Sequence, residues 1–172
     1  MRPSGDEAVT DDEAVTDDEA VTGGVPARKG RALGIDLGSR RIGIAVTDSE
    51  GTLALPRATL VRTGDVEQDR RRLIELIIEE KAVVVVVGLP LSLDGSRGRA
   101  ATAAVEEAAI LRQQLESRHI GVELFDERLT SVSAHQALAA GGSTSRQRRH
   151  IVDQAAAAVM LSAWLDSSVG SK

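Results

Sequence analysis

The sequence predicts one α/β domain, in which helices flank a mixed five-stranded sheet and the elements follow the order βββαβαβαα. Closely spaced short apolar runs after residue 31 indicate a meander of strands. The five consecutive valines Val83–Val87 indicate a strand that is covered on both faces. Apolar stripes at helical spacing separate the later strands, which indicates helical crossovers. A chain of 172 residues suits one such domain with a tail.

The first 30 residues differ from the rest of the chain. The hexapeptide DEAVTD occurs three times between residues 6 and 22, with the last copy incomplete. Residues 1–30 as a whole carry eight acids and three bases, so this segment accounts for the net charge of -5. Few large apolar side chains are available for burial there, so we expect residues 1–30 to be a disordered acidic tail. The folded domain is then expected to span residues 31–168, and residues 169–172 to form a flexible C-terminus.

Three strands are expected to open the domain. Ala32–Asp36 and Ile42–Thr47 are apolar runs joined by a polar connection, a pattern that is typical of a β-hairpin. A third strand is expected within Leu53–Val61. Because Pro56 interrupts this run and cannot donate a backbone hydrogen bond, the third strand should lie at an edge of the sheet or contain a bulge.

Helices are expected between the later strands. Asp65, with a glutamine three residues on, resembles a capping box and should begin a helix that continues to about Lys81. After the valine strand, an alanine-rich helix is expected to end at about Arg118, followed by a strand over Val122–Phe125.

The last third of the chain should be helical, with a short helix over about Thr130–Ala140, a polar basic loop over residues 143–148 and a final helix over about His150–Asp166.

Composition excludes several classes of protein. The absence of cysteine excludes a disulfide scaffold, a thiolate metal site and a cysteine nucleophile. No apolar run is long enough to cross a bilayer and the start of the chain is acidic, so we expect a soluble, cytoplasmic protein. Phe125 and Trp164 are the only aromatic residues, which excludes a base-stacking platform of several aromatic side chains.

Four acidic residues interrupt otherwise apolar elements. Asp36 ends the first expected strand, Asp126 and Glu127 end the last strand, and Asp153 lies in an apolar stretch of the final helix. A carboxylate at the edge of an apolar core is costly unless a cation or hydrogen bonds compensate it. Each acid alone has an ordinary alternative role: Asp36 could cap the following turn, Asp126 and Glu127 could pair with Arg128, and Asp153 could complement the positive start of the final helix. Together they predict a catalytic site that holds two Mg²⁺ or Mn²⁺ ions and hydrolyses a phosphodiester bond, with Gly88 at a close approach of the backbone to this site.

Arginines close to these acids in sequence are candidate contacts for a nucleic-acid backbone, because guanidinium groups bind phosphate bidentately. A solvated charge run is the ordinary alternative. The candidates are Arg40, Arg41, Arg128, Arg146, Arg148 and Arg149. By contrast, Arg70, Arg71 and Arg72 share a helix with several glutamates, and we expect them to form ion pairs on the helix surface.

Four segments of the chain together resemble the YqgF/RuvX family. They are residues 34–48 (GIDLGSRRIGIAVTD), 87–96 (VGLPLSLDGS), 125–131 (FDERLTS) and 152–157 (VDQAAA). The resemblance spans nearly all of residues 31–172. It implies an RNase H-like fold and a cytoplasmic, metal-dependent nuclease that acts in ribosome biogenesis, on the 5′ end of pre-16S rRNA. Some members of the family are described instead as Holliday-junction resolvases.

The resemblance also implies roles for the acidic residues. Asp36 matches the metal ligand on the first strand, and Asp153 matches the ligand on the C-terminal helix. The Asp-Glu-Arg run falls on Asp126 and Glu127, of which only one should face Asp36 because side chains alternate along a strand. We favour Glu127. RuvC-type enzymes carry an acid on the strand that here reads Val83–Val87, and its absence counts against junction resolution.

Other functional classes are weighed against this one. Residues 34–38 (GIDLG) also resemble the phosphate loop of sugar kinases and Hsp70-like ATPases, but the chain is too short for their two lobes. A non-catalytic RNA- or protein-binding factor on the same fold stays open, and metal-dependent cleavage discriminates it from a nuclease. The expected partner is a nucleic acid, either pre-rRNA or branched DNA, and the sequence leaves open a monomer or a homodimer.

Overall fold

The computed structural model describes residues 30–130 and 145–169. Apart from single residues at their borders, three predicted segments lie outside this part of the chain. They are the acidic tail over residues 1–30, the short helix over about Thr130–Ala140 and the C-terminus over residues 169–172.

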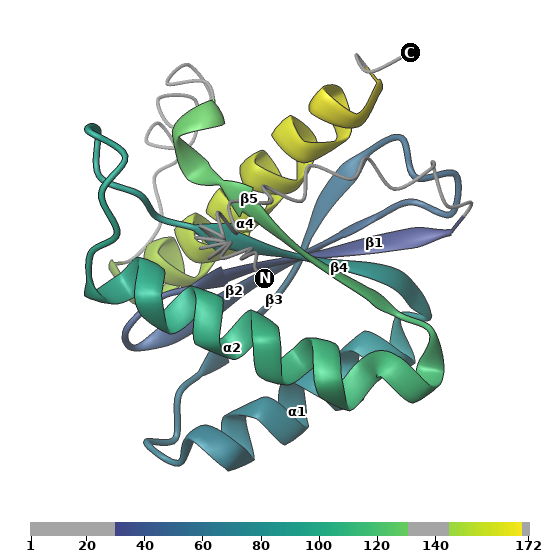
Figure 1. Cartoon of the computed structure of the whole chain (residues 1–172), viewed down its shortest axis with the longest axis horizontal. Coiled ribbons are helices and arrows are strands. Elements are labelled where there is room, and N and C mark those ends of the chain that lie inside the picture. Colours follow the sequence, from purple (N-terminus) through teal and green to yellow (C-terminus); the bar gives the residue numbers. More distant parts are fainter. Residues whose placement is uncertain (1–29, 131–144, 170–172) are drawn as a thin grey trace, which may run out of the picture.

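A single mixed sheet of five strands, in the order β3-β2-β1-β4-β5, organises the described residues (Figure 1). Its strands are β1 (Arg31–Leu37), β2 (Arg41–Thr47), β3 (Ala54–Val61), β4 (Ala82–Leu89) and β5 (Gly121–Asp126). β1, β2 and β3 form an antiparallel meander, whereas β4 runs parallel to β1 and β5 parallel to β4. The predicted mixed sheet is confirmed, and Pro56 lies on the edge strand β3 as expected.

Helices cover both faces of the sheet. They are α1 (Val66–Glu79), α2 (Arg99–Leu115) and α4 (Ser145–Val169), with short 3₁₀ turns η1 (Glu116–Arg118) and η2 (Glu127–Leu129). Figure 1 shows α1 and α2 on one face and α4 on the other. Leu33 and Ile35 of β1 belong to the core beneath α1 and α2, whereas Ala32 belongs to the core beneath α4. Because side chains alternate along a strand, Asp36 lies on the α4 face.

The predicted start of α1 is confirmed in atomic detail. The Asp65 carboxylate accepts a hydrogen bond from the backbone N–H of Gln68, which satisfies one of the donors left unpaired at a helix start. The helix ends at Glu79, two residues before the predicted end. Lys81 adopts a φ of 54°, and this left-handed conformation cannot continue a right-handed helix.

The predicted basic loop over residues 143–148 is wrong for its last four residues, because α4 begins at Ser145. Arginine and glutamine are good helix formers, and neither glycine nor proline occurs within α4. The helix therefore extends over the residues whose charge suggested a loop.

Arg70 does not lie on the surface of α1, so its predicted role in surface pairing is wrong. Its side chain is only 5% exposed, and it binds Glu67 of α1 and Glu107 of α2. Two parallel hydrogen bonds of 2.8 and 2.7 Å join Arg70 to Glu107. This bidentate pair connects the two helices across their interface.

Within the described ranges, no helix has the length and apolar character required to cross a membrane.

Candidate nuclease site

The C-terminal ends of β1, β4 and β5 lie at one edge of the sheet, close to the start of α4 (Figure 1, left side). Asp36 is the penultimate residue of β1, Glu127 directly follows β5, and Asp153 lies in α4. In parallel α/β sheets this edge is the usual place for a ligand, because the connections that leave the strands there can carry functional side chains.

Gly43 positions Asp153 next to Asp36. Gly43 is the partner of Asp36 in the β1–β2 ladder, so the two residues share a face of the sheet. A Cβ atom on Gly43 would overlap the backbone carbonyl oxygen of Asp153 and lie 2.9 Å from its carbonyl carbon. The backbone of α4 therefore rests directly on β2 at this point, which brings Asp153 and Asp36 to the same region.

Gly88 leaves space for the side chain of Glu127 close to Asp36. In the β1–β4 ladder Ile35 is paired with Val87, so Gly88 comes beside Asp36 at the next position. A Cβ atom on Gly88 would overlap Oε1 of Glu127 and lie 3.2 Å from its carboxylate carbon. The expected close approach at Gly88 is confirmed, and the approaching group is the carboxylate of Glu127.

The electrostatics of Glu127 reflect this crowded position. Burial, followed by repulsion from Asp36 and Asp126, raises the pKa of Glu127 from its usual 4.5 to about 7. Glu127 is thus half-buried and close enough to Asp36 for their carboxylates to repel each other. Oxygen donors in such an arrangement suit a hard divalent cation, which would offset the repulsion.

We expect Glu127→Gln to stabilise the metal-free protein at alkaline pH. A raised carboxyl pKa means that the folded state retains a proton that the unfolded state has lost, so stability falls as pH rises from about 4.5 through about 7. Glutamine removes this penalty. With EDTA present, the variant should be about 1–2 kcal/mol more stable than the wild type at about pH 8, or about 3–6 °C in Tm, and should match it near pH 5. An equal Tm at both pH values would contradict the repulsion between the carboxylates.

The carboxylate of Asp126 is bound to Arg128. Its Oδ1 accepts hydrogen bonds of 3.0 Å from the backbone N–H and from Nε of Arg128, and its Oδ2 lies 2.6 Å from Nη2 of the same residue. The hydrogen bonds from the Arg128 guanidinium hold the pKa of Asp126 below its usual range. Asp126 therefore caps η2, and the geometry favours Glu127 as the acid that faces Asp36.

Asp153 is held by an arginine. Its Oδ2 accepts a 2.5 Å hydrogen bond from Nε of Arg41, and both side chains are about one quarter exposed. Among the residues that the structure describes, no three histidine, aspartate or glutamate side chains are grouped closely enough to hold a metal ion. The structure thus brings Asp36 and Glu127 close enough to repel each other, whereas the Asp153 carboxylate is not grouped with them and forms an ion pair with Arg41.

The arginines predicted to contact a nucleic-acid backbone differ in their exposure and in their partners. Arg40 is exposed in the β1–β2 turn, whereas Arg41 and Arg128 are paired with Asp153 and Asp126. Three further candidates lie in the first turns of α4, and their side chains are outside the described part of the chain; they are Arg146, Arg148 and Arg149.

Sequence reasoning missed Arg62. Its Nε donates a 2.9 Å hydrogen bond to the carbonyl oxygen of Gly38, in the turn that follows Asp36. A basic residue directly after the edge strand was the available signal, but only the sheet topology shows that this position adjoins the turn.

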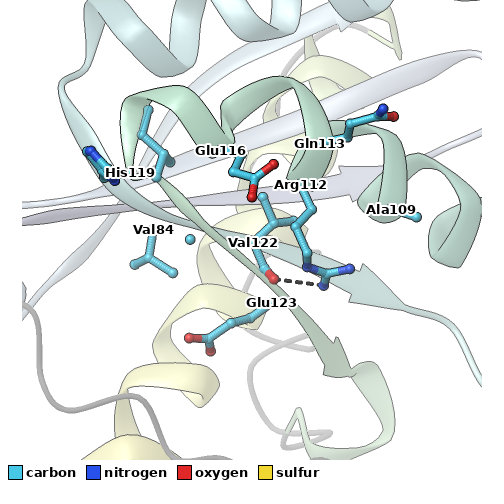
Figure 2. A pocket seen from close by; sticks show the side chains of 10 residues that line it. Val84, Ala109, Arg112, Gln113, Glu116, His119, Val122 and Glu123 are labelled. Carbon is cyan, nitrogen blue, oxygen red and sulfur yellow. Dashed lines mark hydrogen bonds between the residues drawn. The ribbon is translucent and has the colours of Figure 1, made fainter.

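A cavity of about 630 Å³, shown in Figure 2, is lined by none of these carboxylates. It is lined by the C-terminal part of α2 and by the beginning of β5, and therefore belongs to the opposite edge of the sheet. Inside it, Nη2 of Arg112 donates a 2.9 Å hydrogen bond to the carbonyl oxygen of Val122. No carboxylate of the site described above lines this cavity, so we do not assign the reaction to it.

Comparison with protein families identifies the chain. The family model described as "RuvX: Holliday junction resolvase" matches residues 30–167. The chain belongs to the RuvX family. The predicted resemblance is therefore confirmed.

Proteins named "Putative pre-16S rRNA nuclease" are similar over most of their length. The protein from Nocardia farcinica is 47% identical over 143 residues, which cover 80% of this chain and 78% of that protein. The protein from Corynebacterium diphtheriae is 41% identical over 147 residues, which cover 81% of this chain and 86% of that protein. The predicted class, a nuclease, agrees with the names of these RuvX relatives.

Solved structures show the fold that the RuvX chain shares. Thermus thermophilus RuvC in complex with a Holliday junction substrate superposes with a TM-score of 0.55 at 15% identity, covering 83% of this chain and 97% of that one. The yeast mitochondrial Holliday junction resolvase superposes with a TM-score of 0.53 at 10% identity, covering 82% of this chain and 80% of that one. The predicted RNase H-like fold is confirmed.

Proposed function

We propose that this chain is a metal-dependent nuclease that hydrolyses phosphodiester bonds at the 5′ end of pre-16S rRNA, and that it acts in the cytoplasm with its nuclease domain in residues 31–168. The observation that carries the proposal is the half-buried Glu127 carboxylate, which packs against Gly88 at the C-terminal edge of the sheet and is repelled by Asp36. The names of the RuvX relatives support the choice of substrate.

Asp36, Glu127 and Asp153 would hold the metal ions. Their oxygen atoms are the donors that Mg²⁺ and Mn²⁺ prefer, and repulsion between Asp36 and Glu127 makes a cation favourable at this position. Two such ions, when bound, activate a water molecule and stabilise the leaving oxygen of a phosphodiester. Glu127 must be ionised to act as a ligand, so activity should rise with pH as this carboxyl loses its proton.

Arg41 and Asp153 exchange partners when substrate binds. In the structure each compensates the charge of the other, at a half-buried position. A phosphate group offers the Arg41 guanidinium a second, bidentate partner, and this exchange releases Asp153 toward the other two carboxylates. Arg41 would then hold the substrate phosphate next to the acids.

Other arginines would hold the nucleic acid on either side of the cut. Arg40 is exposed beside Arg41, and Arg128 lies at the end of β5. The arginines in the first turns of α4, which precede Asp153 directly in the chain, are proposed for the same role.

A second candidate function is the resolution of Holliday junctions. The description of the family model favours it. The sequence of β4 counts against it, because this strand (AVVVVVGL) carries no acid at the position where RuvC-type enzymes have one. We therefore rank pre-rRNA cleavage first.

Cleavage of two labelled substrates tests the proposal. A pre-16S rRNA fragment and a four-way DNA junction are each incubated with the full-length chain and Mg²⁺ or Mn²⁺. We expect cleavage of the RNA, and a loss of about a thousandfold or more in Asp36→Asn and Asp153→Asn, with the fold and RNA binding retained. Cleavage of the junction alone would replace the proposal with a resolvase, and RNA binding without cleavage would replace it with a binding factor.

A further inference from the structure

Three arginines border the catalytic edge on the side of the sheet that leads to α1. Arg40 lies in the β1–β2 turn, Arg62 directly follows β3, and Arg72 lies in α1. Figure 1 shows the β1–β2 turn and the connection from β3 to α1 on the same side of the molecule, which is also where β4 ends. We call these three residues the arginine ridge.

Arg62 is built into the turn that follows Asp36. Its backbone N–H donates a 3.0 Å hydrogen bond to the carbonyl oxygen of Arg40, and its Nε donates a 2.9 Å hydrogen bond to the carbonyl oxygen of Gly38. The backbone N–H of Gly38 in turn donates a 3.1 Å hydrogen bond to the carbonyl oxygen of Asp36. The Arg62 guanidinium is thus fixed to the same turn as the first catalytic acid.

Arg72 is fixed beside Arg62. Its Nη1 donates a 3.1 Å hydrogen bond to the carbonyl oxygen of Val61 and lies 3.7 Å from Oδ1 of Asp69. Asp69 is 4% exposed, and its carboxylate also accepts hydrogen bonds from the backbone and the hydroxyl of Thr63. The Arg72 side chain remains 39% exposed. Its head group is therefore positioned by the protein and accessible to solvent.

The ridge has a surplus of positive charge and of hydrogen-bond donors. Each guanidinium has five N–H donors, and the contacts described above use one donor of Arg62 and one nitrogen of Arg72. The neighbouring acids have partners of their own, because Asp65 caps α1 and Glu67 binds Arg70. Asp69 is thus the carboxylate beside Arg62 and Arg72, whereas the ridge carries three guanidinium groups.

We propose that the arginine ridge binds the phosphates of the nucleic-acid strand that flank the one being cut. The proposal rests on the nuclease function proposed above and specifies where the substrate runs. Guanidinium groups anchored to backbone carbonyls are held in place before binding, so less conformational entropy is lost when a phosphate is bound bidentately. Arg62 of the ridge is bound to Gly38, two residues after Asp36, so one strand can contact both the carboxylates and the ridge.

RNA binding in EDTA tests this proposal without any cleavage. The affinity of a fluorescein-labelled single-stranded RNA is measured by anisotropy over a series of salt concentrations, for the full-length wild type, Arg62→Gln, Arg72→Gln and the double variant. We expect a loss of about tenfold for each single variant at low salt. The slope of log affinity against log salt should become shallower by about 0.7 for each arginine removed.

Arg118→Gln is the matched control. Arg118 is an exposed arginine of η1, which precedes the start of β5 and so lies at the opposite edge of the sheet. It should bind RNA as the wild type does. Arg62→Lys and Arg72→Lys retain the charge, and should recover the salt slope but only part of the affinity.

Two outcomes would contradict the proposal that the arginine ridge binds phosphates. One is a double variant that binds RNA as tightly as Arg118→Gln does. The other is a loss of affinity with an unchanged salt slope, since this would indicate a purely structural effect. Both outcomes are independent of catalysis. A wild type that binds RNA through the ridge but does not cleave it would therefore refute the nuclease function and still support the proposed role of the ridge.

Discussion

Replacing Gly88 by alanine is expected to reduce cleavage by about a hundredfold or more while the domain stays folded. The added methyl group would occupy the space of Oε1 of Glu127, and the overlapping atom is the end of a side chain that can rotate away. Alanine is also the better residue in a strand. The carboxylate is therefore displaced from Asp36 at little cost in stability, and displacement of a catalytic group by about 1 Å can reduce the rate about a hundredfold.

Measuring the cleavage rate and Tm together identifies this effect. Gly98→Ala is the control, because nothing lies within 4 Å of a Cβ atom at Gly98 and its φ of -80° is accessible to alanine. The control should retain the wild-type rate. A Gly88→Ala enzyme that cleaves as fast as Gly98→Ala would show that the position of Glu127 over Gly88 is irrelevant to the reaction.

Replacing Gly43 by alanine should instead destabilise the whole domain, by about 3 kcal/mol. The methyl group would collide with the carbonyl group of Asp153, which belongs to the backbone of α4 and cannot rotate aside. The entire helix must move away from β2. For a chain of this size, the loss corresponds to a decrease of about 10 °C in Tm.

Urea and thermal unfolding measure this loss, with Gly98→Ala again as the reference. Cleavage by the folded fraction should also decrease, since the movement carries Asp153 away from Asp36. If Gly43→Ala unfolds at the same urea concentration as the reference, then α4 does not rest on β2 in the manner described.

Local patterns in the sequence predicted most of the fold. The polar connection between two apolar runs indicated the β1–β2 hairpin, and the five valines indicated an interior strand. These signals depend on residues that are close in sequence. The burial of Arg70 could not be predicted in the same way, because its partner Glu107 belongs to another helix and becomes a neighbour only when α1 and α2 pack together.

The candidate site was predictable in part for the same reason. Acids that interrupt apolar elements are visible in the sequence, which is why Asp36, Glu127 and Asp153 could be named. The sequence favoured Glu127 over Asp126 without showing a partner for Asp126, and the conformation of η2, in which Arg128 turns back onto Asp126, supplies that partner. The pairing of Arg41 with Asp153 required the packing of α4 on β2, a contact between distant parts of the chain.

The two faces of the sheet differ in how they respond to redesign. Beneath α1 and α2 the core consists largely of leucine, isoleucine and valine. On the other face, small alanine and glycine residues allow α4 to pack directly against the backbone of the sheet. Efforts to make the protein more heat-resistant by enlarging core residues should therefore be confined to the α1 and α2 side. On the α4 side, an added methyl group would push the helix that carries Asp153 away from the sheet. A substitution that raised heat resistance there would therefore lower the rate of turnover.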